Sequence, residues 1–178
     1  MSSQLYIRIV DANHIDYAVI NSAGEIEQAG AAFHDDQLPN LPRELPTTLL
    51  VPGESVLLLT AHLPKTSPAQ LRRAVPYALE EQLIDNIENL HFAIGKQNSA
   101  GNVLVAVVQK SLLQTWLTQC QRWQFEPNIV LPDFLAVSAL ENTWHIYLDG
   151  DRALVRQTAQ QGMNVQRDQL AELLRLSI

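Results

Sequence analysis

The sequence predicts a mixed α/β fold, because strand-like and helix-like segments alternate along its 178 residues. Short β-branched and apolar runs, bounded by turn residues, occur in groups of two or three, as in antiparallel strand pairs. Two longer segments between these groups carry apolar residues at three- and four-residue steps, the spacing of amphipathic helices. A hairpin and a helix complete the order, and no fixed-period repeat is visible.

The chain is expected to open with a three-strand meander. Turn residues at 11–14 and 21–24 separate its strands, and the proline-rich residues 33–46 form a connection. Asn98–Asn102 is a second turn-rich segment, and Asp149-Gly150 is a strong hairpin signal. The expected strands are residues 5–10, 15–20, 25–29, 48–51, 55–61, 90–94, 103–109, 128–131, 144–148 and 153–157.

The first helix has a clear start, with Ser67 as N-cap, Pro68 at the first helical position and Gln70 completing a capping box. Pro76 is expected to kink it, because proline removes a backbone bond and clashes with the preceding turn. Its apolar stripe is Leu71, Ala74, Val75, Ala78, Leu79, Leu83 and Ile87. The second helix has an apolar face of Leu112, Leu113, Trp116, Leu117, Cys120 and Trp123, and Ser111 and Gln114 are placed for a second capping box. Asp168 is expected to cap a last helix that carries Leu170, Leu173, Leu174 and Leu176.

The charge balance excludes several classes of partner. Twelve basic and nineteen acidic side chains give a net charge of −7, which argues against nucleic acid and against anionic lipid bound by charge alone. The segment 1–100 holds six basic and twelve acidic residues, so it carries nearly all of the excess. No signal peptide or apolar 20-residue run is present, and we expect a soluble, cytosolic polypeptide.

The residues predict no catalytic, cofactor or metal site. Cys120 is the one cysteine and lies on an apolar helix face, which indicates a core residue rather than a nucleophile. The five histidines, His14, His34, His62, His91 and His145, stand singly without ligand spacing. Neither a Gly-x-Ser-x-Gly elbow nor a P-loop occurs.

Asp11 at the end of the first strand has two interpretations. A three-strand opening with such an aspartate resembles the nucleotide-binding proteins of the actin, hexokinase and Hsp70 superfamily, whose next turn is rich in glycine. Here Ala12, Asn13 and His14 follow, so no glycine opens the turn toward a phosphate. We favour Asp11 as a turn former over a role toward phosphate or metal.

The first helix carries its charges in an unusual order. Arg72 and Arg73 lie near its N-terminal end, whereas Glu80, Glu81, Asp85 and Glu88 occupy its middle and C-terminal end, the reverse of what the helix dipole favours. Either this is a solvated face balanced by tertiary neighbours, or a partner or second copy supplies the counter-charges. The candidate contact residues are Arg72, Arg73, Tyr77, Glu80, Glu81 and Asp85.

The same helix carries a family resemblance. Residues 70–83 read QLRRAVPYALEEQL and are followed by Leu90-His91-Phe92-Ala93. Further matches are residues 131–136, LPDFLA, then Trp144, residues 153–156, ALVR, and Gly162. Together these motifs resemble the cytoplasmic domain of protein L of the bacterial type II secretion system, over most of the chain.

This resemblance implies a non-catalytic adaptor with an actin-like fold (RNase H-like), without a working nucleotide site and without a cofactor. Its implied partners are the N-terminal domain of the secretion ATPase, protein E of the system, the inner-membrane platform protein M, and a second copy in a homodimer. Residues 1–142 are expected to form the first lobe, and 143–178 the start of a truncated second lobe. The membrane helix of the family is absent from this sequence.

Two other functions stay open. One is an actin-like nucleotide-binding protein, either an ATPase or an ATP-binding adaptor of type IV pili. The other is a general interaction domain whose partner is unrelated to secretion.

Overall fold

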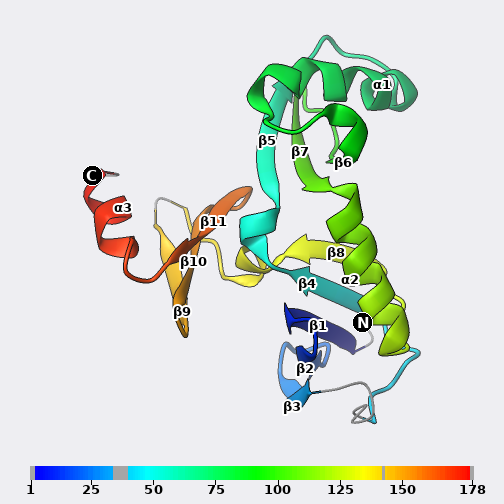
Figure 1. Cartoon of the computed structure of the whole chain (residues 1–178), viewed down its shortest axis with the longest axis vertical. Coiled ribbons are helices and arrows are strands. Elements are labelled where there is room, and N and C mark those ends of the chain that lie inside the picture. The colour runs from blue at the N-terminus through cyan, green and yellow to red at the C-terminus, as the bar shows by residue number, and fades with distance from the viewer. Residues whose placement is uncertain (1–2, 34–39, 142, 177–178) are drawn as a thin grey trace. The chain divides into compact units, whose positions relative to one another are not determined.

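The structure is a computed structural model and describes residues 3–33, 40–141 and 143–176. These residues form two compact units (Figure 1). We call Ser55–Thr115 the small unit, and the described residues before and after it the large unit. Part of the predicted connection 33–46, together with His34, lies outside the described residues.

The large unit contains a five-stranded mixed sheet. Its strand order is β3-β2-β1-β4-β8, in which β1 pairs in parallel with β4 and β4 with β8, while β1–β2 and β2–β3 are antiparallel. Ile7 at the centre of β1 lies opposite Tyr17 on one side and Leu49 on the other. The strands are β1 (Gln4–Asp11), β2 (His14–Ile20), β3 (Ile26–Phe33), β4 (Thr47–Val51) and β8 (Ile129–Pro132).

Helix α2 (Lys110–Arg122) begins in the small unit, and its part from Trp116 on belongs to the large unit, whose buried residues include Leu5, Ile7, Leu49 and Val51. Alternate residues of β1 are buried, as expected for a strand with one covered face. On α2, Trp116 and Cys120 are buried, and Gln119 Nε2 donates to the Asp11 carbonyl oxygen at 2.7 Å. This hydrogen bond ties the helix to the turn between β1 and β2.

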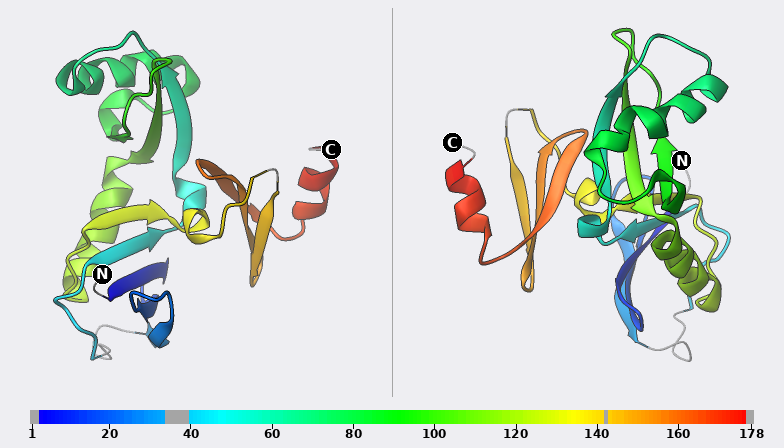
Figure 2. Two further views of the ribbon diagram at one scale, coloured as in Figure 1. Left: turned by 180° about the vertical axis from the view of Figure 1, so that it is seen from behind. Right: turned by 45° about the horizontal axis from the view of Figure 1, so that its top comes forward.

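A second, antiparallel sheet of three strands belongs to the same unit, with the order β11-β10-β9. Helix α3 (Leu170–Leu176) follows it and lies beside it in both views of Figure 2. A Cβ atom at Gly162 would come within 2.6 Å of the Phe134 ring, so glycine allows this close approach. The strands are β9 (His145–Asp149), β10 (Arg152–Thr158) and β11 (Gln161–Gln166), and Phe134 belongs to the short helix η4 (Asp133–Ala136).

The small unit has its own sheet, with the order β5-β7-β6, and its own core under helix α1 (Pro68–Leu79). Leu71, Val75 and Leu79 of the helix are buried against apolar residues of the three strands. The strands are β5 (Leu57–His62), β6 (Leu90–Ile94) and β7 (Asn102–Gln109), and the short helices are η2 (Glu80–Gln82) and η3 (Ile87–Asn89), with η1 (Gly53–Ser55) at the boundary of the units.

The start of α1 is as predicted, whereas its end is not. Ser67 and Gln70 form the capping box, and Pro76 lies inside the helix. The helix ends at Leu79 and a 3₁₀ turn follows, so Leu83 and Ile87 lie beyond it, although the apolar spacing had suggested a longer helix.

Two smaller expectations were wrong, and one strand was not predicted. Ser111 lies inside α2, which starts at Lys110 directly after β7, and therefore cannot be its N-cap. Strand β11 was not predicted, because its sequence QGMNVQ lacks an apolar run. The last helix begins at Leu170, two residues after the expected cap Asp168.

In the described part of the chain, no helix combines the length and the apolar character that crossing a membrane requires.

Candidate functional site

The candidate contact residues begin on the exposed side of α1. Arg72 and Arg73 are both exposed, and Tyr77 follows Arg73 by four residues, which places the two on the same side of the helix. Tyr77 is 70% exposed, a large value for an aromatic side chain. The buried residues Leu71, Val75 and Leu79 hold the opposite side of α1 in the core.

The acidic candidates follow the helix rather than belonging to its C-terminal half. Glu80 is the C-cap, Glu81 lies in η2, and Asp85 lies beyond η2. Asp85 accepts a hydrogen bond of 2.9 Å from Gln109 Nε2 at the end of β7, which positions its carboxylate. Ile84, which lies between Glu81 and Asp85 in the sequence, is fully exposed. We call Tyr77, Glu80, Glu81, Ile84 and Asp85 the acidic patch.

The acidic patch concentrates the negative charge of the small unit. The four carboxylates of residues 55–115 all lie between Glu80 and Glu88. No ion pair joins them to another residue of this stretch, which the structure describes throughout. Because the helix ends at Leu79, its dipole acts mainly on Glu80. The patch therefore combines exposed apolar side chains with carboxylates that form no ion pair within the small unit.

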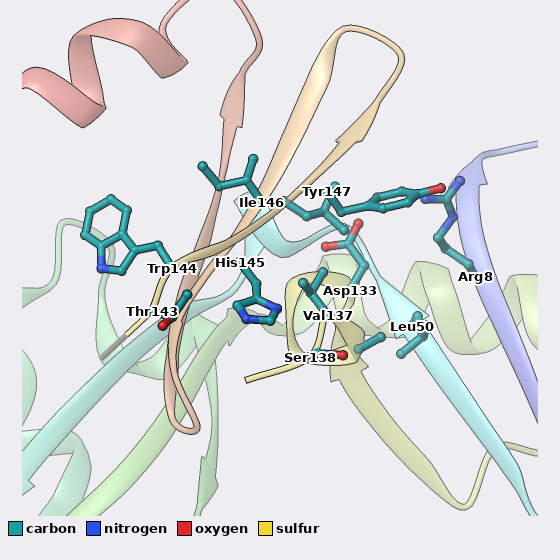
Figure 3. Close-up of a pocket in the computed structure, with 12 residues that line it drawn as sticks. Arg8, Leu50, Asp133, Val137, Ser138, Thr143, Trp144, His145, Ile146 and Tyr147 are labelled. Carbon is teal, nitrogen blue, oxygen red and sulfur yellow. The ribbon is translucent and has the colours of Figure 1, made fainter. Parts of the chain in front are cut away.

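A second candidate site is a cavity of about 680 Å³ in the large unit (Figure 3). Its walls come from three places: β1 and β4 of the first sheet, the segment around η4, and strands β9 and β10 of the second sheet. The lining residues include Arg8, Leu50, Asp133, Val137, Ser138, Trp144, His145, Ile146, Tyr147 and Leu154.

Arg8 at this cavity takes part in an ion-pair network. Its guanidinium donates to Asp16 Oδ2 at 2.6 Å and to Asp149 Oδ2 at 2.8 Å. Arg152 donates to the same Asp149 oxygen at 3.0 Å and to Glu54 Oε1 at 3.2 Å. Burial alone would raise the pKa of Asp149, but the hydrogen bonds and charges of the two arginines outweigh it and lower that pKa. The network thereby joins the first sheet to the β9–β10 hairpin.

Asp133 is the buried member of this group, with 1% of its surface exposed. Its Oδ1 accepts hydrogen bonds from the Gly53 N–H at 3.0 Å and from Asn164 Nδ2 at 2.8 Å. Its Oδ2 has no hydrogen-bond partner among the described residues, and Arg152 Nη1 lies 3.9 Å from it. Burial raises the pKa of Asp133, and the hydrogen bonds and Arg152 offset this only in part.

Residues 9–178 match the family described as type II secretion system (T2SS), protein L. The chain belongs to the protein L family. The resemblance noted in the sequence is thereby confirmed, and membership places the chain among the components of a protein secretion system.

Several curated members of the protein L family are similar to this chain. The protein of Pectobacterium carotovorum is 31% identical over 155 residues, 87% of this chain and 35% of the relative. The protein of Dickeya chrysanthemi is 41% identical over 96 residues, 54% of this chain and 24% of the relative. The chain therefore spans about a quarter to a third of these relatives, which carry the name of a secretion-system component and not of an enzyme.

Two solved structures share the fold. The cytoplasmic domain of EpsL, an inner-membrane component of the type II secretion system of Vibrio cholerae, superimposes with a TM-score of 0.80 at 24% identity, covering 97% of this chain and 74% of that one. A PilM–PilN type IV pilus biogenesis complex matches with a TM-score of 0.68 at 11% identity, covering 98% of this chain and 65% of that one. The mixed α/β fold class predicted from the sequence is confirmed, and the fold is the one shared with these two structures.

Other residues singled out in this protein L sequence have structural roles. The Asp11 carboxylate accepts a hydrogen bond from the Asn13 N–H at 2.8 Å, which is the turn-forming role favoured above. Cys120 is buried, and burial raises the pKa of its thiol to about 11, so it remains a neutral core residue. Among the described residues, no group of histidine, cysteine and acidic side chains could hold a metal ion.

Sequence reasoning missed the cavity and its network. Asp133 was noted only within the matching motif LPDFLA, and Asp149 only as part of a turn. The usable signals were a carboxylate inside an otherwise apolar segment and an arginine, Arg8, in an otherwise apolar strand. Charges in such segments are paired or functional more often than they are incidental.

Proposed function

We propose that this member of the protein L family is a non-catalytic scaffold at the cytoplasmic face of the bacterial inner membrane. It recruits the secretion ATPase to the membrane platform by binding the N-terminal domain of that enzyme. Its other partners are the platform protein M and a second copy of the chain, and the whole protein reaches the membrane through a helix outside this sequence. Its work is positioning, and we assign it no reaction.

The observation that carries this proposal is the family match over residues 9–178. The EpsL cytoplasmic domain, a structural relative, supports it. The EpsL domain is described as part of an inner-membrane component of the secretion system. A cytoplasmic domain of a membrane component is suited to connect soluble machinery to the membrane.

The exposed side of α1 and the acidic patch are the surface that we assign to the ATPase domain. Tyr77 and Ile84 offer exposed apolar surface, and the neighbouring charged side chains are exposed as well. Interfaces of this kind gain affinity from a few apolar or aromatic anchors, and they gain specificity and association rate from complementary charge. We therefore expect a partner surface with an apolar pocket bordered by basic side chains, and acidic side chains opposite Arg72 and Arg73.

The direct test reverses the two arginines. Arg72→Glu combined with Arg73→Glu should weaken binding of the ATPase N-terminal domain about tenfold, measured by isothermal calorimetry at low salt. The difference from the unmodified protein should shrink as salt is added, because exposed charges are screened.

The matched control is Lys65→Glu combined with Lys96→Glu, which makes the same change of charge at two exposed positions of the small unit outside α1. The control should bind almost normally. If both double variants bind as tightly as the unmodified protein and remain folded, the assignment of this surface is wrong. If the ATPase domain does not bind the unmodified protein at all, the scaffold proposal itself fails.

Nucleotide binding is the alternative, and the charges beside the cavity argue against it. Asp133, Asp149 and Glu54 would meet the anionic phosphates there, while Arg8 and Arg152 are already paired with carboxylates. Mg-ATP should therefore leave the melting temperature unchanged, whereas a clear rise would favour a nucleotide-binding protein.

A further inference from the structure

The network beside the cavity in the large unit holds more negative than positive charge. Two guanidinium groups, those of Arg8 and Arg152, form ion pairs with four carboxylates. His14 adds a contact of 3.1 Å to Asp16, and even a protonated His14 would leave one negative charge in excess. The carboxylates are those of Asp16, Glu54, Asp133 and Asp149.

The buried, unpartnered oxygen among these carboxylates is Asp133 Oδ2. This oxygen is buried and has no hydrogen-bond partner among the described residues, and its residue lines the cavity. The contact from Arg152 Nη1 at 3.9 Å is too long for a hydrogen bond, because that nitrogen lies closer to Glu54. A buried carboxylate oxygen left in this state costs free energy that a donor in the cavity would recover.

The rest of the cavity wall is mainly apolar. Leu50, Val137 and Leu154 supply aliphatic surface, and Trp144 and Tyr147 supply aromatic rings (Figure 3). A volume of about 680 Å³ lies within the range of small-molecule sites, which are typically apolar with a few placed polar groups.

We propose that this cavity binds a small organic cation that has an apolar body. Its ammonium or guanidinium group donates to Asp133 Oδ2, and its hydrocarbon part lies against the aliphatic and aromatic wall. The site is separate from the surface assigned to the ATPase domain, since it belongs to the other unit. An anion would face the uncompensated carboxylates, and the described residues hold no metal-binding cluster here.

The experiment compares three probes of similar shape: 2-phenylethylammonium, the uncharged 2-phenylethanol and the anionic phenylacetate. We expect the ammonium to bind about tenfold more tightly than the alcohol, as a charge-assisted hydrogen bond would give, and phenylacetate to bind least. Affinity is measured by calorimetry and location by fluorescence of Trp144. Trp116 and Trp123 lie buried elsewhere, so a Trp144→Phe variant should lose the fluorescence change. It should still release heat on binding.

Two variants test the role of the carboxylate. Asp133→Asn removes its charge and should abolish the preference for the ammonium over the alcohol. Asp151→Asn makes the same chemical change at an exposed position of the β9–β10 turn and should leave that preference intact.

The proposal is overturned if the alcohol binds the unmodified protein as tightly as the ammonium, or if the two variants behave alike. Should Asp133→Asn fail to fold, the comparison of ammonium with alcohol on the unmodified protein and the Trp144 signal still decide the question.

Discussion

Asp149 and Asp133 both lie close to Arg152, but their pKa values shift in opposite directions. Asp149 accepts hydrogen bonds from two arginines, and its pKa is lowered because these interactions exceed the cost of burial. Asp133 is more deeply buried and has only a distant arginine, so its pKa is raised. For these carboxylates, the partners that reach each oxygen decide the direction of the shift.

This difference gives a prediction for Asp149→Asn. The ionised Asp149 stabilises the fold at all pH values above its ordinary pKa of 3.8, and this contribution is lost as the pH falls below that value toward its lowered folded pKa. The variant should therefore lose about 2 kcal/mol in the free energy of unfolding at pH 7, because two arginines lose a charged acceptor. The loss should shrink in denaturation curves recorded below pH 3.8.

Asp151→Asn serves as the comparison, since this exposed side chain lies in the same hairpin. It should change the free energy of unfolding by less than about 0.5 kcal/mol at every pH. An equal, pH-independent loss in both variants would contradict the role of the ion pairs.

At the scale of single elements, helix α1 has a start that is encoded locally. Ser67 Oγ accepts the Gln70 N–H, and the Gln70 side chain accepts the Ser67 N–H in return. Ser67→Ala should cost about 1 kcal/mol of stability, because it leaves the Gln70 N–H without its partner. Chemical denaturation measures this, with Ser99→Ala at an exposed position of the turn 98–102 as the control. If the two substitutions cost the same, the cap contributes nothing.

Features encoded by neighbouring residues were predictable, and features that depend on distant contacts were not. The start of α1 and the turn at Asp149-Gly150 follow from local residue types. The end of α1 did not follow from its pattern, because Leu83 and Ile87 keep the apolar spacing after the helix has stopped.

Neither β11 nor the cavity was predicted from the sequence, because both depend on contacts between distant residues. Gly162 in β11 matters because Phe134 packs against it. Asp133 accepts hydrogen bonds from Gly53 and Asn164, which are 80 and 31 residues away in the sequence. Nothing near Asp133 in the sequence therefore indicates its partners. The candidate residues on α1 could be proposed because charge order and exposure are visible in a helical pattern.

At the scale of the whole molecule, the chain leaves one compact unit at Glu54 and returns to it at Trp116. Each unit has a sheet and buried apolar residues of its own, such as Leu49 and Val51 in the large unit and Val75 and Leu79 in the small unit. A segment with its own core can unfold locally while the remainder stays native. The small unit presents the proposed ATPase surface, so its stability can be studied separately from the cavity.

Leu79→Ala tests this independence. Leu79 is fully buried, and its removal should destabilise the small unit by about 3 kcal/mol through lost burial and an unfilled cavity. Hydrogen exchange read by mass spectrometry should accelerate in peptides from β5, β6 and β7 and remain nearly unchanged in β1 and β4. Leu49→Ala in the large unit should give the converse pattern, because Leu49 is equally buried in β4. Equal acceleration in both units for either variant would mean that the chain unfolds as one cooperative body, and binding defects at α1 would then need a correction for global stability.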